Sequence, residues 1–136
     1  MASHTAFAEL LRALSREHAR TLVIGGLAKR LHGEKADAGD HCLWYDAEDE
    51  NAERVYRALS RIGADLDGVS AIDLSDVGYE YRHGEGDDEI CLYGGVDGVT
   101  FADAWPRRLE THFNDIPLCV IGRDALHATE YAERAR

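Results

Sequence analysis

The chain has 136 residues, 45% of them hydrophobic, which fits one domain with its own core and argues against a disordered or membrane-embedded chain. Its formal net charge of −11 repels phosphate backbones, so we do not expect duplex nucleic acid as a partner. No apolar run approaches the ~20 residues of a membrane-spanning helix, and the first residues lack the basic and apolar regions of a signal peptide. We therefore expect a cytoplasmic protein with no membrane partner.

Helical and extended patterns alternate through the first half of the chain. Apolar residues at positions 7, 10, 11 and 14 predict an amphipathic helix capped by Ser3 or Thr5. A short β-branched run then ends at Gly25-Gly26, which indicates a buried strand and a turn. In chain order, the patterns predict a helix over 7–14, a strand over 21–24, a short helix over 27–31, a strand over 41–45, and a helix that opens with the acidic run 46–53 and ends at Gly63.

Turn signals and paired extended runs dominate the second half. Residues 65–76 are rich in turns, with one helical turn among them, and 101–105 predicts a short helical piece stopped by Pro106. Two hairpins are predicted, 77–83 with 89–93 and 108–113 with 116–121, before a terminal helix over 123–135. We expect one domain over 1–136 of the α/β (α+β) class, a mixed and mostly antiparallel sheet with helices on one face.

Several segments carry a resemblance to a known superfamily. The segments 23–28 (Val-Ile-Gly-Gly-Leu-Ala), 31–33 (Leu-His-Gly) and 40–44 (Asp-His-Cys-Leu-Trp) resemble the opening of the DNA polymerase β-like nucleotidyltransferases. The small bacterial abortive-infection and toxin–antitoxin-type branch is most similar. The strand 89–95 resembles the one that bears the third carboxylate in that pattern, and the similarity continues through 101–105 and 116–121. The resemblance implies a nucleotidyltransferase-like fold.

The resemblance also implies a metal site, and this chain departs from it. In such enzymes two divalent ions bridge a nucleoside triphosphate and activate the attacking hydroxyl, and three carboxylates hold the ions. Asp40 matches the first carboxylate, but Cys42 and Cys91 stand at the second and third positions, and Glu130 stands about where relatives often carry a lysine. Because thiols are poor ligands for Mg²⁺, we expect neither Mg²⁺ as a cofactor nor ordinary nucleotidyl transfer.

Asp40, Cys42 and Cys91 are expected to converge, and several interpretations of this patch stay open. Cysteines can fill a retired site as small hydrophobes. Two thiolates and a carboxylate would suit Zn²⁺ if His83 or His112 supplied the fourth ligand. A disulfide between the cysteines would close a loop of roughly 49 residues, although a cytosolic setting argues against it. Deliberate engineering of the site is a further interpretation.

Gly25, Gly26 and Lys29 are the candidate nucleotide-binding residues. The glycine pair could cradle phosphates with backbone N–H groups, or it could serve only as a tight turn. Lys29 could pair with phosphates or be a solvated surface residue. We interpret three other features as structural. The acidic run is a solvated helix start, Cys119 is a buried thiol, and both tryptophans are core or core-edge residues.

The predicted function follows from this balance of surviving and missing motifs. We expect a non-catalytic or weakened nucleotidyltransferase-like protein that binds a nucleotide-like or other small-molecule ligand, a soft metal, or a protein partner such as a second copy. The alternative is an active nucleotidyltransferase with an altered metal site, in which Asp40 is the remaining catalytic carboxylate and the substrate is a small molecule, RNA or protein.

Overall fold

A computed structural model of the chain describes residues 2–36, 41–86 and 89–134. The strands are β1 (Thr21–Val23), β2 (His41–Tyr45), β3 (Glu80–His83), β4 (Ile90–Tyr93), β5 (Leu109–Phe113) and β6 (Ile116–Val120). The helices are α1 (Ala2–Arg16), α2 (Gly25–Leu31), α3 (Asp49–Arg61), α4 (Ala71–Leu74), α5 (Phe101–Ala104), a 3₁₀ turn (Trp105–Arg107) and α6 (Arg123–Arg134). None of the helices in this described part of the chain is long and apolar enough to cross a membrane.

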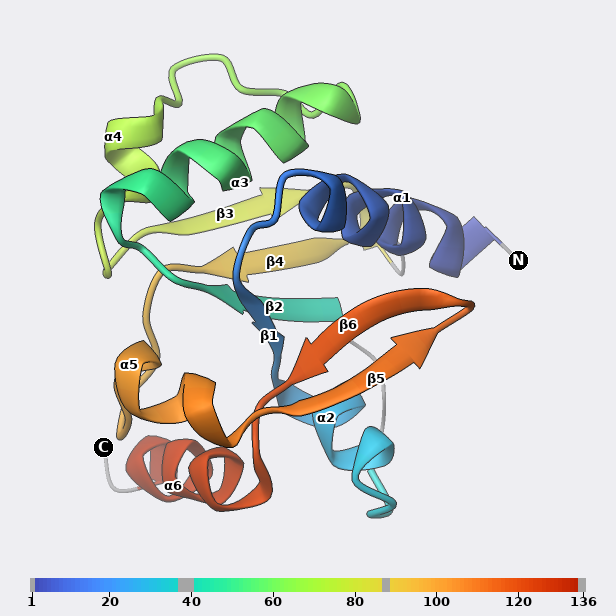
Figure 1. The fold of residues 1–136 in the computed structure, drawn as a ribbon, viewed down its shortest axis with the longest axis vertical. Helices are drawn as coiled ribbons and strands as arrows, with labels where there is room; N and C mark the ends of the chain where they lie inside the picture. The colour runs from blue at the N-terminus through green and yellow to red at the C-terminus, as the bar shows by residue number, and fades with distance from the viewer. Residues whose placement is uncertain (1, 37–40, 87–88, 135–136) are drawn as a thin grey trace.

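All six strands join one sheet in the order β3-β4-β2-β1-β6-β5 (Figure 1). The pairs β1–β2, β3–β4 and β5–β6 are antiparallel, whereas β2–β4 and β1–β6 are parallel. The predicted α/β (α+β) class, with a mixed and mostly antiparallel sheet, is confirmed. The crossovers place β2 at the centre, next to β4 on one side and β1 on the other.

The central strand β2 presents different residues to the two faces of the sheet. His41 and Leu43 point to the face covered by α1, where the ring of Phe7 stacks on His41 with 4.5 Å between centroids. Cys42 and Trp44 point to the opposite face, because side chains alternate along a strand. The alternation predicted for 41–45 is therefore confirmed.

Helices flank both faces of the sheet, so the expectation of helices on one face is wrong. Figure 1 shows α1 and α3 together on one side and α2, α5 and α6 on the other. On the second side, the ring of Phe101 in α5 meets Trp44 edge-on at 5.2 Å. The reason lies in β2 itself, since an indole on the second face needs apolar cover as much as the residues on the first.

The first helix differs from the prediction only at its start. Its apolar stripe, which includes Phe7 and Leu10, is fully buried against the sheet, as expected. The helix begins at Ala2, so neither Ser3 nor Thr5 precedes it as a cap, and that prediction is wrong. Helix boundaries are set by local backbone hydrogen bonds that the apolar period does not encode.

The helix α3 begins three residues later than the acidic run suggests. Glu48 is the N-cap, and its carboxylate accepts hydrogen bonds from the backbone N–H groups of Glu50 and Asn51. These bonds lower the pKa of Glu48, because they stabilise the charged form. The acidic run is thus a capped helix start, as the sequence predicts, and its apolar stripe faces the core.

Both predicted hairpins are present. Residues of β3 and β4 pair in antiparallel register, although the hairpin tip at 87–88 lies outside the described residues. In the β5–β6 hairpin, Asn114 and Asp115 have φ angles of 49° and 66°. Two successive positive φ values are typical of a type I′ turn, whose twist matches that of the flanking strands and which Asn and Asp tolerate well.

A buried asparagine ties α3 to the sheet, and the sequence analysis did not single it out. Asn51 is 1% exposed, and its Oδ1 accepts from the backbone N–H of Arg20 at 2.7 Å. Its Nδ2 donates to the carbonyl oxygens of Arg20 at 3.1 Å and Asp46 at 2.7 Å. Arg20 immediately precedes β1 and Asp46 immediately follows β2, so one side chain fixes the ends of both strands.

Candidate functional site

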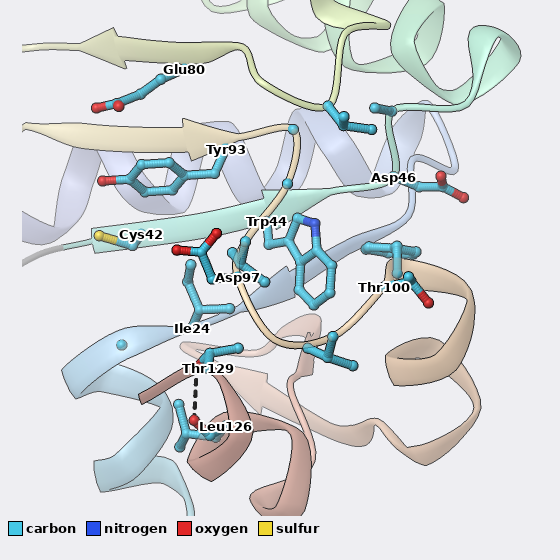
Figure 2. Close-up of a pocket in the computed structure, with 18 of the residues that line it drawn as sticks. Ile24, Cys42, Trp44, Asp46, Glu80, Tyr93, Asp97, Thr100, Leu126 and Thr129 are labelled. Carbon is cyan, nitrogen blue, oxygen red and sulfur yellow. Dashed lines mark hydrogen bonds between the residues drawn. The ribbon is translucent and has the colours of Figure 1, made fainter. Parts of the chain in front are cut away.

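A groove of about 1260 Å³ lies on the face of the sheet that Cys42 and Trp44 share (Figure 2). Strands β2, β3 and β4, the start of α2, the segment 94–101 and helix α6 all contribute to its walls. Its lining includes Ile24, Gly25, Gly26, Lys29, Cys42, Trp44, Asp46, Glu48, Tyr79, Glu80, Tyr93, Asp97, Thr100, Phe101, Leu126, Thr129 and Glu130. Residues from distant parts of the chain therefore meet in one concave site.

Close backbone approach shapes the wall formed by the segment after β4. A Cβ atom at Gly94 would lie 2.5 Å from the carbonyl oxygen of Asp76, and one at Gly95 would lie 2.5 Å from that of Val77. Real Cβ atoms do not come so close, so only glycine allows these two segments to touch. The pair Gly94-Gly95 thus positions the groove wall that continues to Asp97.

The glycine pair after β1 lies in the groove, as the sequence predicts. Gly25 has a φ of 73°, a conformation that favours glycine, at the point where the strand turns into α2. The backbone N–H of Ile24 donates to the carbonyl oxygen of Cys42 at 3.2 Å, which fixes the turn to β2. The tight-turn reading is accounted for by this geometry, whereas a phosphate-binding role for Gly25 and Gly26 stays a prediction.

Lys29 also lines the groove, but it has an acidic partner. Its ammonium forms an ion pair with the carboxylate of Glu130, which reaches across from α6. Glu130 therefore neutralises the lysine of the neighbouring helix. The expected role of Lys29 in binding phosphate has to compete with this pair.

The expected proximity of the two cysteines is confirmed. Cys42 and Cys91 are register partners on the parallel strands β2 and β4, so their side chains lie next to each other on the groove face. All three cysteines of the chain lie in its described part, and none of them forms a disulfide. Asp40, the third member of the expected cluster, lies outside the described residues.

Hydrogen-bond donors surround the sulfur of Cys91. The guanidinium Nη1 of Arg82 lies 3.0 Å from it, and the Tyr93 hydroxyl and the Cys42 thiol also hydrogen bond to it. Burial raises the pKa of the Cys91 thiol, and the carboxylate of Glu89, which accepts from the sulfur at 3.9 Å, also raises it, while Arg82, Tyr93 and Cys42 act in the opposite direction. Burial likewise raises the pKa of Tyr93. At neutral pH the patch therefore carries a protonated thiol beside a guanidinium cation.

The described residues do not complete a zinc site. No group of three or more His, Cys, Asp or Glu side chains in the described part of the chain could hold a metal ion. His83 alternates with Arg82 on β3 and therefore points to the opposite face from Cys91. His112 lies on β5, at the far edge of the sheet from β4. The proposal that either histidine supplies the fourth ligand is therefore wrong.

The charges in the groove are mainly negative. Among the described residues that line it, Lys29 is the one lysine, and it faces a set of carboxylates contributed by the segment after β2, by β3, by the segment after β4 and by α6. These carboxylates are Asp46, Glu48, Glu80, Asp97 and Glu130. Arg82 adds a cation at the edge of the groove but is already paired with Glu80 and Glu89.

The sequence analysis missed several residues of the groove, and some of them could have been predicted from the hairpin. Once β3 and β4 form a hairpin, the register that pairs Arg82 with Cys91 also pairs Glu80 with Tyr93 on the same face. Asp97 gave no signal, because its place depends on the loop. Trp44 was expected in the core, and it is 1% exposed, but its Nε1 lacks a hydrogen-bond partner among the described residues.

Cys119 differs from its predicted environment. It was expected to be a buried thiol, but it is half-buried on β6 and lies near Arg108 rather than near the other cysteines. Burial nevertheless raises its pKa. It does not contribute to the groove.

Comparison of the chain with protein-family models, with curated proteins and with solved structures finds no match. The residues of the groove and the resemblance in sequence pattern therefore remain as the indications of function.

Proposed function

We propose that this chain is a nucleotidyltransferase-like cytoplasmic protein that binds a small-molecule ligand in the groove and does not carry out ordinary Mg²⁺-dependent nucleotidyl transfer. The pairing of Cys42 with Cys91 is the observation that carries the proposal. The resemblance assigns carboxylates to both positions, and here the two thiols hydrogen bond to each other instead.

The surroundings of the thiols also oppose a divalent cation. A neutral thiol contributes neither charge nor a hard oxygen to a magnesium ion. The guanidinium of Arg82, 3.0 Å from the Cys91 sulfur, places a positive charge beside the position where the resemblance would put the metal. Because Glu80 and Glu89 pair with this guanidinium and 53% of the Arg82 side chain is exposed, its repulsion is partly offset, and the loss of hard oxygen ligands is the main obstacle to a bound ion.

The shape and charge of the groove suggest the class of ligand. Phe101 and Tyr93 provide aromatic surface, and the nearly buried indole of Trp44 lies behind it. Because carboxylates outnumber lysine among the described residues of the groove, a neutral or cationic molecule is favoured over a free triphosphate. A nucleotide-like ligand would accordingly bind through its base and sugar rather than through its phosphates.

The test is a transfer assay with each of the four labelled nucleoside triphosphates and with Mg²⁺ or Mn²⁺. We expect no transfer to the protein, to RNA or to small-molecule acceptors above the level of a heat-denatured sample. Robust turnover that disappears in an Asp40→Ala variant would contradict the proposal and establish the alternative, an active enzyme with an altered metal site. The carboxylates of the groove favour this alternative, because they are hard oxygen ligands for a metal ion.

A second prediction concerns the ion pair between Lys29 and Glu130. The Glu130→Gln variant should bind ATP several-fold more tightly than the unmodified protein in titration calorimetry, because it releases the ammonium of Lys29 and removes one repelling charge. The gain should shrink as salt is raised, as charge pairs near a surface are screened.

The matched control repeats the substitution without the lysine. In a Lys29→Met background, Glu130→Gln should give a smaller gain, since only the repulsion is relieved. Equal gains in the two backgrounds would show that Lys29 does not face the phosphates.

A further inference from the structure

The register of the sheet places the thiols of Cys42 and Cys91 next to each other. Neighbouring strands are about 4.8 Å apart, and disulfide-bonded residues have Cα atoms about 4.4–6.8 Å apart. Cys42 and Cys91 are direct register partners on such strands, and their side chains share one face. The backbone therefore brings them within bonding range without a change of fold.

The two thiols differ in access and in surroundings. Cys42 is half-buried and lines the groove, so a reagent that enters the groove meets it first. Cys91 is 4% exposed, and Arg82, Tyr93 and Cys42 all hydrogen bond to its sulfur. Figure 2 shows the Cys42 sulfur and the Tyr93 hydroxyl pointing toward the same end of the groove.

We propose that Cys42 and Cys91 are a reversible redox modification site, with Cys42 as the attacking thiol, Cys91 as the resolving thiol and a low-molecular-weight disulfide as the oxidant. This inference depends on the strand register and not on the proposed ligand-binding function.

The reaction has two exchange steps, illustrated with oxidised glutathione. The Cys42 thiolate attacks one sulfur of glutathione disulfide, whose S–S bond breaks, and one glutathione leaves and takes up a proton. The Cys91 thiolate then attacks the Cys42 sulfur of the mixed disulfide, and the second glutathione leaves and takes up the proton that Cys91 has lost. Two protein thiols are oxidised to one disulfide, and glutathione disulfide is reduced to two thiols.

Arg82 is the positioning residue of the second step. The resolving group has to react as a thiolate, and burial holds its pKa high. The guanidinium 3.0 Å away stabilises the thiolate as it forms, so it speeds the attack on the mixed disulfide. The bond would also tie Cys42, which lines the groove, to the neighbouring strand β4.

The experiment incubates the full chain with oxidised glutathione and follows free thiols, intact mass and peptide maps. Three free thiols are expected to fall to one, with a Cys42–Cys91 cross-linked peptide, and reduced glutathione in excess should restore all three. Cys119→Ser should still form the cross-link. Failure of oxidised glutathione to react, or glutathione adducts on Cys42 and Cys91 without the cross-link, would overturn the proposal.

Two variants separate the steps. Cys91→Ser should stop at a stable mixed disulfide on Cys42, and Cys91→Ala provides the same test if the serine is poorly tolerated. Arg82→Gln should leave the first step unchanged but prolong the lifetime of the mixed disulfide by an order of magnitude. An unchanged lifetime would remove Arg82 from the mechanism, and a first adduct on Cys91 would reverse the assigned roles.

Discussion

A triple variant, Cys42→Asp/Cys91→Asp/Arg82→Gln, should bind Mg²⁺, whereas the unmodified protein should not. The substitutions return carboxylates to the two positions that the resemblance assigns to metal ligands, and they remove the guanidinium that lies beside them. Without metal, two carboxylates that are register partners on neighbouring strands repel each other, so the variant should be less stable than the unmodified protein. The cation should relieve this repulsion.

The readout is the unfolding temperature as a function of Mg²⁺ concentration. At a hundredfold excess over Kd, a ligand that binds only the folded state stabilises it by about 2.7 kcal/mol. For a domain of this size that corresponds to a rise of roughly 8–10 °C. The unmodified protein should show no specific rise.

The matched control replaces both cysteines with asparagine in place of aspartate and keeps Arg82→Gln. Asparagine has nearly the same shape as aspartate but no charge, so this variant should not respond to Mg²⁺. Equal responses of the two triple variants would mean that the carboxylates are not the ligands. No response from the aspartate variant would mean that this part of the groove does not correspond to the metal site of nucleotidyltransferases.

The thiol pair illustrates what the sequence could predict about the site. The strand 41–45 was predicted from its alternation and the strand 89–93 from its place in a hairpin, and both predictions are confirmed. The proximity of Cys42 and Cys91 is expected through the resemblance alone, and the parallel direction of the pairing is not predicted. Periodicity fixes which residues share a face of a strand, but it does not fix which strand lies next in the sheet.

The ion pair between Lys29 and Glu130 illustrates what the sequence could not predict. The two residues are far apart in the chain and meet only because α2 and α6 lie on the same side of the sheet. The apolar period of a helix shows which of its residues face the sheet, but it does not show which other helix lies beside it. The position of Arg82 next to Cys91 could have been predicted, because it follows from the register of the predicted hairpin.

The largest loss of stability is expected from Asn51→Asp, because this position has one acceptor role and two donor roles. The substitution keeps an oxygen for the N–H of Arg20, but it turns a second oxygen toward the carbonyl groups of Arg20 and Asp46, which need donors. Because Asn51 is 1% exposed, a carboxylate that faces two carbonyl oxygens at this position lowers the free energy of unfolding more than the loss of the hydrogen bonds alone would. We expect the free energy of unfolding to fall by about 3–4 kcal/mol, the range of large losses from buried unsatisfied polar groups.

Asn51→Ala should cost less, about 2–3 kcal/mol, because it removes the hydrogen bonds without adding a charge. The deficit of Asn51→Asp relative to the unmodified protein should grow as pH rises. The buried carboxyl has a raised pKa in the folded state, so the unfolded state releases its proton first, and folding is progressively disfavoured until the folded group also ionises. Denaturant titrations at several pH values between 4 and 8 measure this trend.

Glu53→Ala on the exposed face of α3 is the matched control for these variants, and its stability should stay within about 0.5 kcal/mol of that of the unmodified protein. If Asn51→Asp proved as stable as this control, the side chain would not hold the ends of β1 and β2 together. The wall of the groove depends on that connection. Asp46 and Glu48 line this wall, and both follow the end of β2 that Asn51 holds. A selective effect on ligand binding in the milder Asn51→Ala variant would therefore report movement of this wall, at temperatures where the variant is still folded.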